Sequence, residues 1–299
     1  MMKKNLLAIL MLCCASSISA QQNTIDLSGM WRFQSDLMGF GKTPGSELYL
    51  DKLSETIVLP GTTDEGGKGI QTNARHVDRL SRKFEYCGQA WYQREVVIPR
   101  AWENKEITLF LERCHWETTV YVDGKLVGSE EYLGTPNRFL LTKQMTPGTH
   151  TLTICVDNRL KYPMDQWNHG TSEYTQTNWN GIVGRIELLT QEKSHIKSVK
   201  AYPDAAAKKV RLDVLLTNTS KEAKSGMLHL SIREKGGATI NSERISVHLN
   251  GGDSLINQEI SFGKSVKLWD EFNPNLYEAT ATLTMGDAID EEEISFGVR

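Results

Sequence analysis

Residues 107–128 read ITLFLERCHWETTVYVDGKLVG. Apolar residues fall at every second position from Ile107 to Leu111 and again from Val120 to Val122, just before Asp123-Gly124. Alternation with period two is typical of a β-strand with one buried face. An Asp-Gly pair suits a type I′ turn, in which both central residues need positive φ. The stretch therefore predicts β-strands and a tight hairpin at Asp123-Gly124.

The chain on either side of this stretch gives the same β-type signal. Two long polar loops interrupt it, one before Gln89 and one from Asn158 to Asn180, and loops of such length in a compact domain are usually functional or disordered. No amphipathic helix of useful length is predicted. The further strands expected in this half are Leu27–Phe33, Ala90–Pro99, Thr149–Asp157 and Ile182–Thr190.

The composition changes near Gln191, where simpler alternating strands begin. Val210–Leu216, Leu228–Ile232 and Tyr277–Leu283 alternate, with Gly-rich and Asn-rich turn signals between them. About seven short strands in roughly a hundred residues is the immunoglobulin-like pattern. We therefore predict an all-β chain with one β-sandwich over residues 21–192 and an immunoglobulin-like β-sandwich over residues 193–299.

The first twenty residues have the features of a secretory signal peptide. Lys3 and Lys4 precede an apolar run from Leu6 to Cys14, and small residues lead to Ala20. The run is too short to span a bilayer, so no transmembrane span is expected, and we predict export across the inner membrane to the periplasm. Lipid attachment through Cys13 or Cys14 stays open as an alternative.

Charge and cysteine content narrow the possible partners. The formal net charge of -3 offers no basic excess for a phosphate backbone, so no nucleic-acid partner is expected. Cys87, Cys114 and Cys155 allow at most one bridge after the leader, and we interpret them as small buried residues. The histidines are scattered without metal-ligand spacing, so neither a metal nor a cofactor is predicted.

Several motifs in a fixed order carry a family resemblance. In the first half they are LSGMWRF at Leu27, LPGTTDEGG at Leu59, WYQREVVIPRAW at Trp91, LERCHWETTVYVDGKLVG at Leu111, MTPGTHTLTICVDN at Met145 and NWNGIVGRIEL at Asn178. In the second half they are WDEFNPNLY at Trp269 and FGVR at Phe296. The chain thus resembles glycoside hydrolase family 2, which includes β-galactosidases and β-glucuronidases. The resemblance implies a sugar-binding jelly roll of the galactose-binding type, followed by an immunoglobulin-like domain.

The same resemblance places catalysis elsewhere. In that family a (β/α)₈ barrel follows the FGVR-like strand in the usual order and holds two glutamates about 5–5.5 Å apart for retaining hydrolysis. Neither glutamate has a counterpart in the sequence. Glu112 and Glu117 flank the hairpin, and we interpret them as scaffold. We expect no catalytic residue in this sequence, and whether the protein acts as an enzyme stays open.

Carbohydrate contact by the long loops is the more plausible role. Sugars bind to planar aromatic faces and to amide or carboxylate groups, commonly in loops at the end of a rigid sandwich. In the family's β-galactosidases two jelly-roll loops place polar side chains near the substrate, and Asn73 resembles one of these by position. The candidate contact residues are Asn73, Asp165, Trp167, Asn178 and Trp179.

A structural role competes with this assignment. Trp167 and Trp179 could instead pack the loop onto the sandwich, since buried aromatic area alone would justify them. Other aromatic and ring side chains, Trp31, Trp91, Trp102 and His115, are expected to be structural.

Two functions remain from the sequence. The first is a non-catalytic front end of an exo-acting, retaining family 2 glycosidase that contacts a β-linked glycoside or plant-wall oligosaccharide, with the catalytic barrel as a partner encoded downstream. The second is a stand-alone periplasmic module that binds carbohydrate or another protein.

Overall fold

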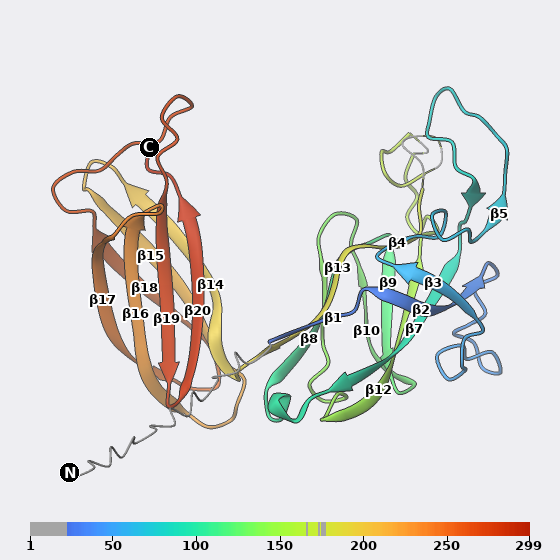
Figure 1. The fold of residues 1–299 in the computed structure, drawn as a ribbon, viewed down its shortest axis with the longest axis horizontal. Helices are drawn as coiled ribbons and strands as arrows, with labels where there is room; N and C mark the ends of the chain where they lie inside the picture. The colour runs from blue at the N-terminus through green and yellow to red at the C-terminus, as the bar shows by residue number, and fades with distance from the viewer. Residues whose placement is uncertain (1–22, 166, 173, 175–177) are drawn as a thin grey trace, which may run out of the picture.

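The computed structural model describes residues 23–165, 167–172, 174 and 178–299, and the regular secondary structure within these residues is nearly all β-strand. Two sandwiches lie side by side, as Figure 1 shows. The predicted all-β class is confirmed. The strands of the first sandwich are β1 (Thr24–Asp26), β2 (Gly29–Asp36), β3 (Glu55–Leu59), β4 (Gly61–Thr62), β5 (Ile70–Gln71), β6 (Phe84–Glu85), β7 (Gln89–Ile98), β8 (Glu106–Cys114), β9 (Glu117–Val122), β10 (Lys125–Glu131), β11 (Asn137–Leu140), β12 (Gly148–Asp157) and β13 (Gly181–Gln191), with a 3₁₀ turn at Arg100–Trp102.

The first sandwich packs two antiparallel sheets against each other. One sheet has the order β10-β9-β12-β7-β2-β3, and the other has the order β1-β13-β8-β11 with β4 beside β13. Alternate side chains from both sheets fill the space between them and form one continuous apolar core. Trp31 and Trp102 are buried in this core, as predicted.

The stretch at residues 107–128 contributes to both sheets. β8 pairs with β13 and β11 in one sheet, whereas β9 pairs with β10 and β12 in the other, so the chain crosses between sheets at His115-Trp116. The two-residue hairpin is confirmed, because Asp123 has φ 49° and Gly124 has φ 73°. The sheet change is the feature that the alternation of apolar residues did not reveal.

A second, smaller apolar cluster lies on the outer face of the six-stranded sheet. The loop after β2 folds over this face and covers Trp91, Tyr121 and Cys155 with Leu53. Tyr49 stacks on Tyr121, with ring centroids 4.5 Å apart and planes 4° from parallel. Trp91 is therefore buried as predicted, but under this loop and not between the two sheets.

The second sandwich is built from strands β14 to β20. One sheet has the order β14-β15-β18 and the other β17-β16-β19-β20, and the two enclose an apolar core of their own. Val298 of the FGVR motif is buried in that core, and its carbonyl accepts a hydrogen bond of 2.7 Å from the Trp269 N–H. The strands are β14 (Ser194–Asp204), β15 (Lys209–Asn218), β16 (Lys224–Glu234), β17 (Thr239–Leu249), β18 (Gly252–Ser261), β19 (Tyr277–Met285) and β20 (Ala288–Phe296).

The remaining sequence predictions differ in outcome. The signal peptide lies outside the described residues. Among the residues that the structure does describe, no helix is long and apolar enough to cross a membrane. Cys114 and Cys155 are buried thiols outside any disulfide, as expected, but Cys87 is exposed, so its predicted burial is wrong. Cys87 lies in the connection just before β7, outside both sheets.

Candidate functional site

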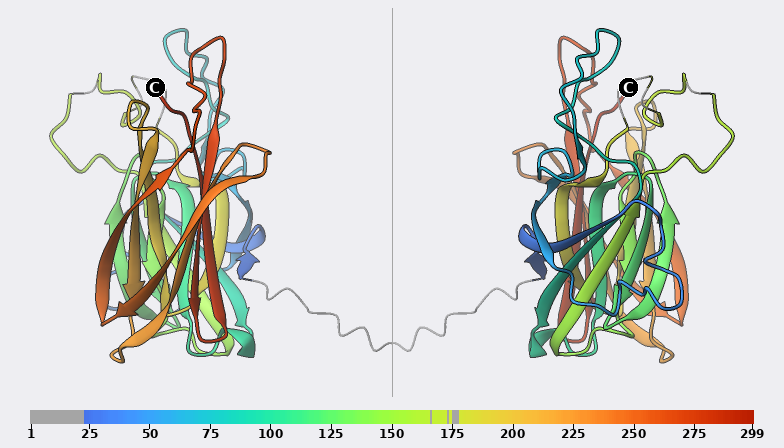
Figure 2. Two further views of the ribbon diagram at one scale, coloured as in Figure 1. Left: turned by 90° about the vertical axis from the view of Figure 1, so that its left-hand side faces the viewer. Right: turned by 90° about the vertical axis from the view of Figure 1, so that its right-hand side faces the viewer.

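Two long loops rise from one end of the first sandwich and then diverge, as the two turned views of Figure 2 show. The first runs from β4 to β7, and its stem is the two-residue ladder of β5 with β6. Asp64 supports this stem by accepting a hydrogen bond of 2.8 Å from the Phe84 N–H. The second loop, residues 158–180, joins β12 to β13.

Buried amide side chains clamp both ends of the second loop to the sandwich. Asn180 is fully buried; its amide nitrogen donates to the carbonyls of Gly88 at 3.1 Å and Val156 at 3.0 Å, and its amide oxygen accepts from the Tyr92 hydroxyl at 3.0 Å. Asn158, at the other end, donates to the Tyr86 carbonyl at 2.9 Å. A buried polar group that satisfies its hydrogen bonds in this way fixes the backbone around it.

Asn178, one of the predicted contact residues, belongs to this clamp. Its side chain is buried and donates to the Asn158 carbonyl at 2.9 Å, and its amide oxygen accepts from the Asn158 amide at 3.2 Å. The Asn178 carbonyl accepts a hydrogen bond from the Arg82 guanidinium of the first loop. In this arrangement Asn178 positions both loops, and its amide does not face solvent.

His115 and Trp179 form a further support under the second loop. His115 is buried, and its Nε2 lies 2.6 Å from the Gly170 carbonyl oxygen. Because a carbonyl only accepts, Nε2 carries the proton. Burial lowers the pKa of His115, against the opposing hydrogen bond to Gly170, so the ring is neutral. The half-buried Trp179 lies with its ring 5.3 Å from the imidazole.

Other predicted contact residues are exposed at the loop surface. The predicted Trp167 is 60% exposed, and it lies against Tyr174, which is 48% exposed; their ring centroids are 6.0 Å apart with planes at 57°. Asp165 is exposed beside them and accepts a 2.9 Å hydrogen bond from the Trp167 N–H, which leaves its second oxygen for a ligand. Asn73 is exposed on the first loop.

The structure therefore separates the five candidate residues into two groups. Asp165 and Trp167 lie together, with Asn73 on the neighbouring loop, whereas Asn178 and Trp179 support the loop from below. Sequence reasoning missed the clamping amides Asn158 and Asn180. Their position directly at the two ends of a long loop, each next to a buried strand, was the available signal.

The two glutamates near the sheet crossing are engaged in ion pairs. Glu112 accepts from the Arg185 Nε at 3.2 Å, and Glu117 lies 3.0 Å from the Lys42 ammonium. The hydrogen bonds from the Arg185 backbone and side chain lower the pKa of Glu112. Glu112 belongs to β8 and Glu117 to β9, and these two strands lie in different sheets.

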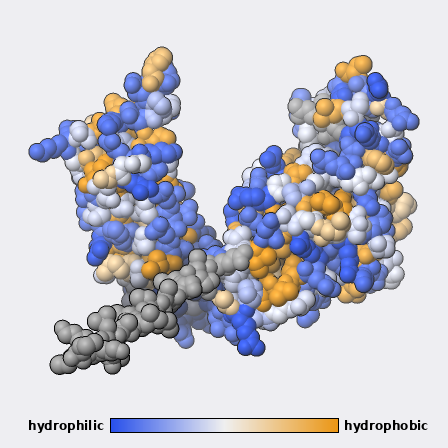
Figure 3. Space-filling model, in the orientation of Figure 1, coloured by the Kyte–Doolittle hydropathy of each residue, from blue (hydrophilic) through white to orange (hydrophobic). Residues whose placement is uncertain are grey.

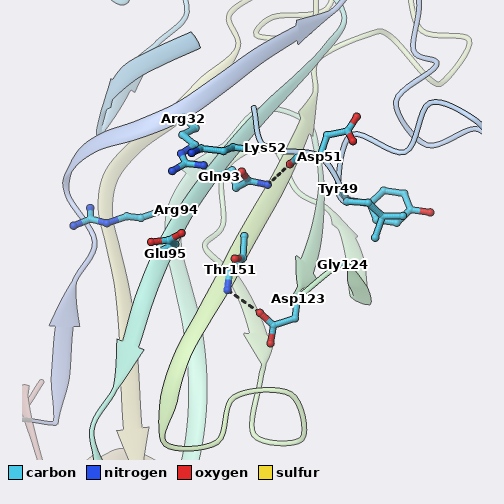
Figure 4. Close-up of a pocket in the computed structure, with 11 residues that line it drawn as sticks. Arg32, Tyr49, Asp51, Lys52, Gln93, Arg94, Glu95, Asp123, Gly124 and Thr151 are labelled. Atoms are coloured by element: carbon cyan, nitrogen blue, oxygen red, sulfur yellow. Dashed lines mark hydrogen bonds between the residues drawn. The ribbon is translucent and has the colours of Figure 1, made fainter. Parts of the chain in front are cut away.

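A separate depression of about 410 Å³ lies on the outer face of the six-stranded sheet (Figure 4). Two hydrogen bonds join its lining residues: Gln93 donates to the Asp51 carbonyl at 2.8 Å, and the Thr151 N–H donates to Asp123 at 2.8 Å. The lining includes three basic and three acidic residues, so their formal charges cancel. These six are Arg32, Lys52, Arg94, Asp51, Glu95 and Asp123.

Comparison with known families gives a match across both sandwiches. The model of the glycosyl hydrolases family 2 sugar binding domain matches residues 25–191, more than half of the chain. The chain belongs to glycosyl hydrolases family 2. A second model, glycosyl hydrolases family 2, matches residues 194–299.

Individual family 2 relatives are distant and longer. The chain is 23% identical to the β-glucuronidase of Streptococcus agalactiae, over 94% of this chain and 44% of that protein. It is 22% identical to the β-galactosidase of Thermoanaerobacterium thermosulfurigenes, over 92% of this chain and 37% of that protein. The chain thus spans less than half the length of these relatives.

Solved structures confirm the fold. The crystal structure of Bacteroides uniformis β-glucuronidase superposes with a TM-score of 0.69 at 19% identity, over 92% of this chain and 32% of that chain. A family 2 member from Bacteroides cellulosilyticus gives 0.68 at 22% identity, over 93% and 36%.

Proposed function

We propose that this chain is the non-catalytic front part of a family 2 glycosidase, and that its loop end contacts the carbohydrate. The observation that carries this proposal is the exposed pair of Trp167 and Tyr174 with the Asp165 carboxylate beside it. The two C–H faces of a pyranose pack on such rings, and a free carboxylate oxygen accepts from sugar hydroxyls. Hydrolysis is assigned to carboxylates outside this sequence.

The support beneath the pair strengthens this assignment. The clamp of Asn158, Asn178 and Asn180 and the bond from His115 to Gly170 satisfy the structural needs of the loop without using Trp167. A large aromatic side chain that is 60% exposed contributes little to packing. The named relatives include β-glucuronidases and a β-galactosidase, so both uronic and neutral sugars are candidate ligands.

A second candidate is a stand-alone carbohydrate-binding or interaction module. Its support is that each sandwich encloses an apolar core of its own, so neither needs another domain to bury its apolar side chains. In both cases we propose a periplasmic location, on the basis of the leader at residues 1–20.

The test uses residues 21–299 and isothermal titration with β-linked glucuronides, galactosides and plant-wall oligosaccharides. Loss of one aromatic contact in Trp167→Ala should weaken binding by about 1–2 kcal/mol, or roughly 5- to 30-fold. Tyr202→Ala is the matched control, because Tyr202 is 46% exposed but belongs to the second sandwich.

Three results would overturn the proposal. The first is that the folded protein binds none of the saccharides at millimolar concentration. The second is that Trp167→Ala binds as tightly as the unaltered chain. The non-catalytic role fails if residues 21–299 hydrolyse a chromogenic glycoside and a substitution of Glu112 or Glu117 abolishes that turnover.

A further inference from the structure

The loop that joins β5 to β6 is strongly basic. Residues 72–83 contain four basic side chains and one acidic side chain, although the whole chain has a formal net charge of -3. Figure 3 shows hydrophilic and apolar residues mixed at this loop end. Apolar patches also lie on the body of the sandwich. The charged residues of the loop are Arg75, Arg79, Arg82, Lys83 and Asp78.

These basic side chains differ in whether another group of the protein binds their charge. Arg82 bonds to the Asn178 carbonyl and joins the two loops. Arg75 and Lys83 are exposed, and among the described residues neither side chain has an ion pair or a hydrogen bond. Within the described part of the chain, Arg79 forms one ion pair, with the neighbouring Asp78 carboxylate at 3.5 Å. The loop therefore presents positive charge to solvent.

Arg79 is also the point where the basic loop meets the aromatic pair. Its guanidinium carbon lies 5.8 Å from the centre of the Tyr174 ring, within the range of a cation–π contact. Tyr174 in turn lies against Trp167. A saccharide on these two rings would therefore have its substituents beside the basic loop.

The charge and this geometry point to an anionic ligand. A guanidinium binds a carboxylate or a sulfate with two parallel hydrogen bonds, whereas a neutral sugar offers neither an opposite charge nor a group that accepts both bonds in this way. We propose that the loop end selects anionic β-linked saccharides: the Trp167–Tyr174 pair contacts the pyranose faces, while Arg75, Arg79 and Lys83 meet the negative groups. This inference rests on the proposed carbohydrate contact.

An acidic protein surface is the competing partner for a basic loop. The exposed aromatic pair favours a saccharide, because rings of this kind stack on sugar faces and would not be needed for charge pairing alone. The test below separates the two, since it measures saccharide binding by residues 21–299 without any other protein.

The experiment compares one polysaccharide in three forms by affinity electrophoresis of residues 21–299. The forms are a glucuronoxylan, the same xylan after its carboxyl groups have been reduced, and a sulfated xylan. We expect at least about 5-fold tighter binding to the carboxylated or sulfated form than to the reduced form at low salt. The difference should shrink in about 0.5 M salt, which screens exposed charges. Comparison of the glucuronoxylan with the sulfated xylan shows whether carboxylate or sulfate is preferred.

A double variant assigns the effect to the loop. Arg75→Gln with Lys83→Gln should remove most of the preference for the anionic form and leave binding to the reduced xylan unchanged. The matched control is Arg100→Gln with Lys125→Gln, one exposed arginine and one exposed lysine at the opposite end of the sandwich. Equal binding of all three forms by the unaltered chain overturns the charge inference and leaves carbohydrate contact intact. Absence of binding to every form overturns both.

Discussion

Replacing Asn180 by alanine should destabilise the first sandwich more than any change at the loop surface. Asn180 is fully buried and makes three hydrogen bonds, to Tyr92, Gly88 and Val156. At about 1–1.5 kcal/mol for each bond that is lost without replacement, Asn180→Ala should cost about 3–4.5 kcal/mol. The stability of a typical domain is only about 5–15 kcal/mol, so the effect is large.

Urea unfolding followed by tryptophan fluorescence is a suitable assay. Six of the seven tryptophans precede residue 191 and only Trp269 follows it, so the signal reports mainly on the first sandwich. Tyr92→Phe removes a single one of the three bonds and should cost about 1–1.5 kcal/mol. Asn73→Ala, at an exposed position, should stay within about 0.5 kcal/mol of the unaltered chain.

The reasoning would be refuted if Asn180→Ala lowered the unfolding free energy by less than about 1 kcal/mol with an unchanged dependence on urea. That result would mean that water or a shift of the backbone replaces the three bonds, and that the amide does not hold the loop end.

Two further predictions concern titrating groups. Burial raises the pKa of the Cys114 and Cys155 thiols to about 12, so a thiol reagent at pH 8 should label only the exposed Cys87 among residues 23–299 of the native protein and all three cysteines in urea. Burial lowers the pKa of His115 below 6.5, so the unfolded chain binds a proton that the native chain does not, and stability should fall as pH drops below about 6.5. The loss is about 1.4 kcal/mol for each unit by which the two pKa values differ, and His115→Gln should reduce the loss in urea titrations between pH 7 and 5; an unchanged pH dependence in that variant would contradict the assignment.

The strands and the hairpin could be predicted because their signals are local. Alternation of apolar residues and the Asp123-Gly124 pair depend only on neighbouring positions, and both gave the observed structure. The crossing at His115-Trp116 could not be predicted, because alternation does not tell which of two sheets a strand joins. The short strands β3 and β11 were missed because alternation over four or five residues does not stand out within a polar region.

The candidate site was predictable to the level of the loops but not of each side chain. An amide in a long loop can face a ligand or bond to backbone, and the two cases have the same sequence. Asn178 bonds to Asn158, whereas Asn73 faces solvent, and only their placement in the fold distinguishes them. The basic character of residues 72–83 was readable, but its relation to Tyr174 depends on how the two loops meet.

The structure separates the residues that hold the loops from those that face solvent. The stems are fixed by buried groups such as Asn180 and His115, while Trp167 and Arg75 project from the surface. Substitutions at exposed positions remove little buried area, so their effect on the unfolding free energy should be small. Because a rigid stem keeps the exposed side chains in place at no further entropic cost on binding, stem variants should weaken binding as well as stability. Exposed positions can therefore change ligand preference independently of folding, whereas stem positions cannot.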